Sequence, residues 1–177
     1  MTRKSGLLIL ALALAGGVSE AGADAVGDSN ICYAQFATGD YRSAIDYCTR
    51  AIDSGALPEE DLVTSLLNRG VAFKSVGEYD RAIADYTRAL ALAPDDALLY
   101  QNRANALREK GDLAPALGDI EKAIELNPDS AGAWYVRGAL AEALGNRDVA
   151  RRYYMTALGL DPQNAVYRSK AFGQEAQ

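Results

Sequence analysis

The residue types that most often carry catalysis are scarce in this chain of 177 residues. It contains no histidine, the side chain most often used as a general base and as a metal ligand. It also lacks a glycine-rich phosphate loop ending in Gly-Lys-Ser or Gly-Lys-Thr, and the Gly-x-Ser-x-Gly turn of hydrolases. The carboxylates are scattered, and no pair stands out. We therefore expect a protein that is not an enzyme and that uses no cofactor and no metal.

The N-terminus has the composition of a secretory signal peptide. Two basic residues precede an apolar run over residues 7–15, and the small residues Ala21-Gly22-Ala23 follow. The apolar run is too short to span a bilayer, so we expect cleavage and no membrane insertion afterwards. Cleavage is expected after Ala23, with Ala25 as the alternative. The predicted location is the periplasm, with secretion as the alternative.

The charge balance argues against some partners. Removing residues 1–23 takes away two basic residues and one acidic residue, which leaves 16 Lys and Arg against 23 Asp and Glu, a net charge of −7. An acidic chain without a basic stripe is not expected to bind nucleic acid or an anionic membrane surface.

A period of 34 residues runs from Val63 to Asn164. In the three segments that begin at Val63, Ala97 and Ala131, the same residue types recur at the same places. A strict period of this length is typical of stacked supersecondary units. The aligned sets are an arginine (Arg69, Arg103, Arg137), a glycine (Gly77, Gly111, Gly145), two alanines (Ala82, Ala116, Ala150; Ala89, Ala123, Ala157) and a proline (Pro94, Pro128, Pro162).

Each unit is predicted to hold two helices. Apolar and small residues recur at helical spacing on both sides of the aligned glycine, which can adopt the left-handed conformation that ends a helix. The aligned proline ends the second helix, because the residue before a proline disfavours the α region. We therefore expect an all-α solenoid of stacked antiparallel helical hairpins. The residues predicted to cap the first helices are Asp96, Ser130 and, for a last helix, Asn164.

This pattern resembles the tetratricopeptide repeat (TPR) family. The resemblance rests on the periodic prolines, on Trp134, and on small residues at two positions of each unit: Gly70, Ala104 and Gly138 in the first helices, and Ala82, Ala116 and Ala150 in the second. The aligned arginines depart from it, since they occupy a site that is often leucine. The resemblance implies a right-handed superhelix whose first helices line a concave surface, and it implies protein or peptide binding there.

The repeat register also divides the chain. Residues 1–23 are the signal peptide, 24–57 a degenerate first hairpin, 58–96, 97–130 and 131–164 three regular hairpins, and 165–177 a capping helix with a tail. Within the degenerate unit we expect residues 24–29 to be a flexible lead and the first helix to be poor, because Asp28 and Gln35 stand where large apolar residues are expected.

The two cysteines, Cys32 and Cys48, lie on either side of the turn in the degenerate hairpin. An even pair in an exported chain favours a structural disulfide, which would stabilise the hairpin by about 3 kcal/mol. Two separate buried thiols are the alternative. Metal or redox chemistry has less support, because there is no histidine and no Cys-x-x-Cys motif.

Charged residues at matching positions predict ion pairs inside the hairpins. Arg69 pairs with Asp85 and Arg103 with Asp119 in this register, and both pairs are expected to be structural. In the third regular unit Tyr153 stands at the place of the aspartate, so Arg137 is expected to be freer.

The resemblance also places a set of residues on the concave surface. Side-chain amides at fixed spacing can pair with the backbone of an extended peptide, and Lys74 and Arg108 can bind a carboxylate. Gly132 and Val136 fall where a full carboxylate clamp needs basic residues, so a true clamp is not expected. Asn30, Asn68 and Asn102 stand at the same position of successive units, and this asparagine row could instead serve only to set the stacking of the helices. The predicted groove residues are Asn68, Val71, Lys74, Gln101, Asn102, Asn105, Arg108 and Tyr135.

The function predicted from these features is a non-catalytic adaptor that holds a peptide or protein segment in its concave groove. The alternative is a structural subunit of an envelope assembly, or a self-associating scaffold, that uses its convex or terminal surfaces. A homo-oligomer is compatible with the alternative, and the partner itself is not identified by the sequence.

Overall fold

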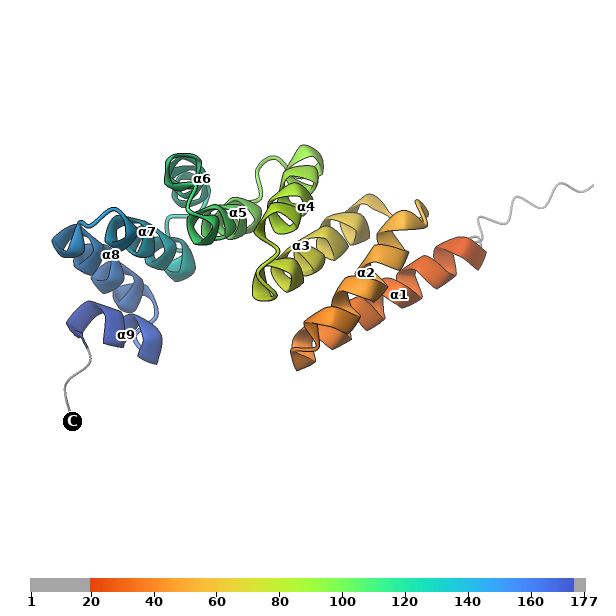
Figure 1. Ribbon diagram of the computed structural model, residues 1–177, viewed down its shortest axis with the longest axis horizontal. Coiled ribbons are helices and arrows are strands. Elements are labelled where there is room, and N and C mark those ends of the chain that lie inside the picture. The colour runs from red at the N-terminus through yellow and green to blue at the C-terminus, as the bar shows by residue number, and fades with distance from the viewer. Residues whose placement is uncertain (1–19, 174–177) are drawn as a thin grey trace, which may run out of the picture.

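The computed structural model describes residues 20–173, and this part of the chain is all-helical, as predicted (Figure 1). Most of the predicted signal peptide, residues 1–19, and the last four residues lie outside the described part. In the described part no helix is both long and apolar enough to cross a membrane. The helices are α1 (Glu20–Thr38), α2 (Tyr41–Asp53), α3 (Glu59–Ser75), α4 (Tyr79–Leu92), α5 (Ala97–Lys110), α6 (Leu113–Leu126), α7 (Ala131–Ala143), α8 (Arg147–Leu160) and α9 (Ala165–Phe172).

The helices form a stacked, extended array with α1 at one end and α9 at the other (Figure 1). Each helix packs on the next in the chain, so that α1–α2, α3–α4, α5–α6 and α7–α8 are antiparallel hairpins. The first helices α1, α3, α5 and α7 also contact one another, whereas the second helices α2, α4, α6 and α8 make no comparable mutual contacts. The array therefore has a first-helix face, formed by α1, α3, α5 and α7, and a second-helix face on the other side.

The predicted helix ends are present. The side chains of Asp96, Ser130 and Asn164 accept hydrogen bonds from backbone N–H groups in the first turns of α5, α7 and α9. The glycines between the two helices of the regular hairpins have φ of +83°, +99° and +82°, the left-handed conformation in which glycine has no steric cost (Gly77, Gly111, Gly145). The capping residues and the glycines therefore determine where each helix begins and where each hairpin turns.

Close crossing of the two helices explains the small residues of the first helices. A Cβ atom built on Gly70 would lie 2.6 Å from the Tyr86 ring, and one on Gly138 would lie 2.6 Å from the Tyr154 ring. Both rings are buried. In the α5–α6 hairpin the equivalent first-helix residue is an alanine, and the bulky residue of α6 is an isoleucine instead of a tyrosine. The size of the small residue thus matches the size of its partner.

Paired arginines connect neighbouring helices on the second-helix side. Arg69 donates two hydrogen bonds to Asp85, from Nε at 2.8 Å and Nη2 at 2.7 Å, and a third from Nη1 to Thr49 on α2. Arg103 repeats the arrangement with Asp119 on α6 and Thr87 on α4. The predicted ion pairs are confirmed. Since each arginine joins its own hairpin to the preceding one, these pairs help to set the stacking.

Arg137 is freer than Arg69 and Arg103 in that it has no aspartate of its own hairpin, as expected, but it is not without a carboxylate partner. Its Nη1 donates a hydrogen bond of 3.1 Å to Glu121 on α6, and its guanidinium lies over the Tyr153 ring at 5.0 Å from the centroid. The sequence register compared only the two helices of one hairpin. The carboxylate comes from the preceding hairpin instead, which the stacking brings within reach.

The first hairpin is better formed than predicted. Residues 24–29 are not a flexible lead but part of α1, which with 19 residues is the longest described helix. Asp28 forms an ion pair of 2.7 Å with Arg50 on α2, and the hydroxyls of Ser29 and Ser65 lie 2.8 Å apart, joining α1 to α3. Polar residues that look unfavourable in a single helix are therefore satisfied by tertiary contacts.

A disulfide joins the two helices of this hairpin. Cys32 on α1 and Cys48 on α2 are bonded, with Cα atoms 5.0 Å apart, and both are fully buried. The pairing agrees with the one predicted from the repeat register. A crosslink between residues 16 apart restricts the unfolded chain and stabilises the hairpin by about 3 kcal/mol.

Two glycine substitutions test the close crossing. We expect Gly70→Ala to lower the free energy of unfolding by about 2 kcal/mol, because its methyl group would overlap the Tyr86 ring. The matched control is Gly118→Ala in α6, where no atom lies within 4 Å of the added Cβ. There alanine should raise the free energy of unfolding by about 1 kcal/mol through helix propensity. Urea titrations followed by circular dichroism measure both, and equal effects would contradict the crossing geometry.

Candidate peptide-binding face

The predicted groove residues of α3 and α5 lie on the first-helix face with different exposure. Asn68 is buried, at 7% exposure, whereas Val71 and Lys74, one and two turns further along α3, are half-buried. On α5, Gln101, Asn102, Asn105 and Arg108 are all half-buried. A ligand on this face would therefore contact the side chains of α5 and of the second half of α3. It would reach little of Asn68, which is buried.

The asparagine row does not link one helix to another in the described residues. The Asn102 side chain donates a hydrogen bond of 2.9 Å to the Leu98 carbonyl of its own helix, and no side-chain hydrogen bond of Asn68 to the described chain is present. Cross-helix bonding instead involves Gln101, whose Oε1 accepts a hydrogen bond of 2.9 Å from Ser130, the N-cap of α7. Gly132 lies against the same Gln101 side chain, where a Cβ would be 2.9 Å from Nε2.

The two basic residues of this face differ in how strongly they are already engaged. Arg108 donates hydrogen bonds to Asn105 and Glu109 at 2.8 Å and 3.0 Å, so its guanidinium is held in place. Lys74, in the last turn of α3, forms no ion pair with any described residue. The face therefore offers one fixed cation on α5 and one adaptable cation on the neighbouring first helix α3.

Tyr135 is half-buried, and its ring is already engaged by other aromatic rings. Its ring lies 5.2 Å from the Tyr167 ring of α9 in a stacked arrangement and 5.5 Å from the Tyr154 ring of α8. The cap helix thus covers this residue, which the sequence placed among the groove residues. Only the tertiary structure brings α9 here, since Tyr135 and Tyr167 are far apart in the chain.

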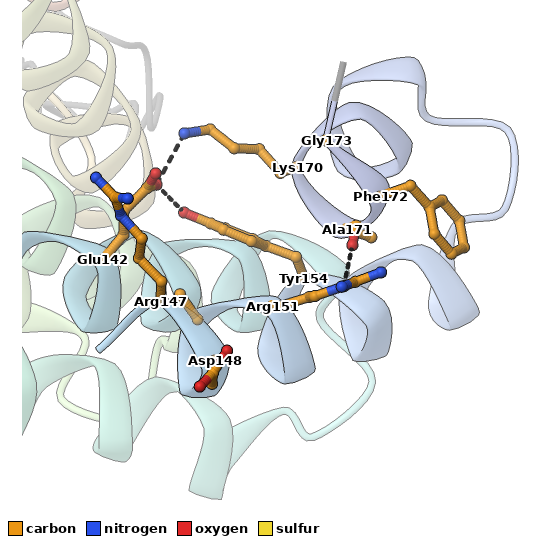
Figure 2. Close-up of a pocket in the computed structure, with 10 residues that line it drawn as sticks. Glu142, Arg147, Asp148, Arg151, Tyr154, Lys170, Ala171, Phe172 and Gly173 are labelled. Carbon is orange, nitrogen blue, oxygen red and sulfur yellow. Dashed lines mark hydrogen bonds and ion pairs between the residues drawn. The ribbon is translucent and has the colours of Figure 1, made fainter. Parts of the chain in front are cut away.

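Glu142 fastens the cap helix to α7. Its Oε2 accepts a hydrogen bond of 2.7 Å from the Tyr154 hydroxyl and one of 2.8 Å from Lys170 on α9 (Figure 2). The bonds from Lys170 and Tyr154 lower the pKa of Glu142 below its usual range. Lys170 and Tyr167 were missed as functional residues, because no sequence pattern relates them to α7.

A cavity of about 340 Å³ lies where α9 meets α8 (Figure 2). Arg147, Arg151 and Lys170 border it together with Glu142 and Asp148, so its charges largely balance. Arg151 is used structurally, since its Nε donates a hydrogen bond of 2.8 Å to the Ala171 carbonyl at the C-terminal end of α9. The described residues contain no cluster of three or more cysteines and carboxylates that could hold a metal.

Comparison with known proteins defines the class. Two tetratricopeptide repeat models match residues 63–96 and 102–165, together more than half of the chain. The chain belongs to the tetratricopeptide repeat family, whose domains mediate protein–protein interactions and bind peptides. No curated protein sequence matches it.

Solved structures agree with this assignment. The second TPR domain of human RPAP3, in complex with the HSP70 peptide SGPTIEEVD, is 32% identical with a TM-score of 0.58, and the match covers 64% of this chain and 95% of that one. The first TPR of Spaghetti (RPAP3), bound to the HSP90 peptide SRMEEVD, is 30% identical with a TM-score of 0.57 (62% and 86%). MamA from Desulfovibrio magneticus RS-1 shares the fold at 20% identity and a TM-score of 0.69 (88% and 84%).

Acid should loosen the cap helix. The folded-state pKa of Glu142 is depressed, so its contribution to stability is present above the unfolded-state pKa and is lost as the pH falls below about 4. Amide hydrogen-exchange protection of α9 should fall on acidification more than that of α5. Glu142→Gln should remove this difference in pH dependence.

The matched control is Glu125→Gln. It removes a carboxylate that is paired with Lys122 within α6, away from α9. It should leave the acid response of α9 unchanged. Equal protection of α9 and α5 at every pH in the wild-type protein would contradict a Glu142-dependent cap.

Proposed function

We propose that this protein is a non-catalytic adaptor that binds an extended peptide segment along α3 and α5 of the first-helix face. The observation that carries the proposal is the row of half-buried polar side chains on α5, together with the half-buried Lys74 on the neighbouring first helix α3. Amides present both donors and acceptors, as the backbone of an extended peptide requires. These groups project from packed helices, so little conformational freedom is lost on binding.

The relatives support a peptide with a carboxylate. The two RPAP3 domains are bound to peptides that end in Glu-Glu-Val-Asp. Here Lys74 and Arg108 supply the positive charge, and Gly132 and Val136 supply none. We therefore propose recognition of one carboxylate by these two cations of α3 and α5, and not the full clamp of a C-terminal acidic motif.

The position of α9 favours a defined length of bound peptide. Tyr135 is packed beneath the cap and Glu142 is paired with Lys170. A peptide that runs along α3 and α5 would therefore meet a covered α7 and end there.

Charge reversal tests the adaptor. We expect Lys74→Glu with Arg108→Glu to weaken capture of the partner from the exported fraction by about tenfold or more, because two charge-assisted contacts are lost. Quantitative mass spectrometry of material bound to the immobilised protein measures this, after circular dichroism has shown that the variant is folded.

The matched control is Arg88→Glu with Arg152→Glu, which makes the same change in net charge on the exposed second helices α4 and α8. This variant should capture the partner as the wild type does. Loss of capture in the control with retention in the test variant would contradict the adaptor and favour the convex or terminal surfaces.

We also propose that the protein is exported after cleavage behind Ala23. Ala25 is only 2% exposed in α1, so cleavage behind Ala23 keeps a buried residue that cleavage behind Ala25 would remove. Expression of the full chain in a Gram-negative host should give a periplasmic protein that begins at Asp24, with Cys32 and Cys48 oxidised. N-terminal sequencing and thiol alkylation measure both, and an uncleaved, reduced cytoplasmic product would contradict export.

A further inference from the structure

The third regular hairpin lacks an internal carboxylate that the other two contain. In the α3–α4 and α5–α6 hairpins, Nε and Nη2 of the arginine bind both oxygens of an aspartate. Nη1 binds the preceding second helix in those hairpins and also in the α7–α8 hairpin, where it meets Glu121. At the position of the aspartate the α7–α8 hairpin has Tyr153, so no carboxylate of its own hairpin faces Arg137.

A cavity of about 300 Å³ opens at this point. It is lined by Glu121, Ile124, Trp134, Arg137 and Tyr153, from α6, α7 and α8. Arg137 follows Tyr135 by two residues, so the two side chains leave α7 in directions that differ by about 200° around the helix axis. The cavity therefore lies on the second-helix side, away from the proposed peptide face.

The walls of the cavity hold the guanidinium in a fixed orientation. The Tyr153 ring lies beneath Arg137, and Trp134 stacks on Tyr153 with ring centroids 5.9 Å apart. Trp134 is itself fixed by a hydrogen bond of 2.7 Å from its Nε1 to the Pro128 carbonyl. The Arg137 side chain is 22% exposed, whereas that of its partner Glu121 is 56% exposed. A single bond to an exposed carboxylate is a weak contact that a better-placed carboxylate can outcompete.

We propose that this cavity, which we name the Arg137 pocket after its cation, binds a glutamate or aspartate side chain of a protein partner. Because Tyr153 fills the position of the aspartate of the other hairpins, the incoming carboxylate takes the place of Glu121 at the guanidinium, which can donate two hydrogen bonds to it. Ile124 and Trp134 give the same pocket an apolar wall, so acidic residues with aliphatic neighbours fit it best. The proposal is independent of the first-helix face.

The chain provides its own reporter, because Trp134 is its one tryptophan and gives one indole N–H resonance. The probes are the capped peptides acetyl-Leu-Glu-Leu-amide and acetyl-Leu-Gln-Leu-amide, which differ only in the carboxylate. We expect the glutamate peptide to shift the indole resonance with millimolar affinity, and the glutamine peptide to bind about tenfold more weakly.

Variants of the pocket separate binding from misfolding. Arg137→Gln should abolish the preference for glutamate. Tyr153→Asp should abolish it as well, because it restores the internal pair of the other hairpins, and this variant should unfold at no lower temperature than the wild type. Glu121→Gln should increase the affinity for the glutamate peptide by about threefold, since it removes the carboxylate that competes for Arg137.

Arg108→Gln, on the opposite face, is the matched control and should change neither affinity. The proposal is overturned if the two peptides bind alike, if Tyr153→Asp keeps the preference for glutamate, or if Arg108→Gln removes it. The last result would place the acidic residue on the first-helix face instead.

Discussion

The whole structure depends on one constraint: a helical hairpin of this kind buries only part of its apolar surface, and a neighbouring hairpin must cover the remainder. Tight crossing inside the α3–α4 and α7–α8 hairpins, where a glycine meets a tyrosine ring, leaves little space for adjustment. Stacking then adds arginine bridges between hairpins, which fix their mutual orientation. Within residues 20–173, the hairpin at each end of the array has a neighbouring hairpin on one side only. At the N-terminal end a buried disulfide supports the first hairpin, and at the C-terminal end α9 packs on α8.

The cap shows how covering the end of the array changes the first-helix face. To cover the end of the array, α9 packs Tyr167 on Tyr135 and pairs Lys170 with Glu142. Both partners belong to α7, whose residues would otherwise extend the first-helix face. The cap therefore covers part of the first-helix face at the C-terminal end of the array, whereas α3 and α5 have neighbouring first helices on both sides.

The two faces have different chemistry for a common reason. On the first-helix face, amides and two cations project beside one another. On the second-helix side, the arginines point between hairpins. Where the repeat contains an aspartate at the matching position, the arginine forms an ion pair with it. A single replacement of aspartate by tyrosine changes the third of these positions from an internal ion pair into a cavity with an aromatic wall. Repetition makes such a departure visible, because the other hairpins show what the position normally does.

The sequence by itself determined the local structure: the hairpins, their caps, their glycine turns, the small residues at the crossings and the pairs Arg69–Asp85 and Arg103–Asp119. All of these depend on residues within one repeat, where the periodicity determines which residues contact one another. The partner of Arg137, the helical state of residues 24–29 and the packing of Tyr135 beneath the cap were decided only by the tertiary structure. Each depends on contacts that a single helix or a single repeat does not show, such as Ser29 with Ser65 and Tyr135 with Tyr167. Local patterns cannot encode these contacts, since their geometry arises only when the hairpins stack and the ends of the array must be covered.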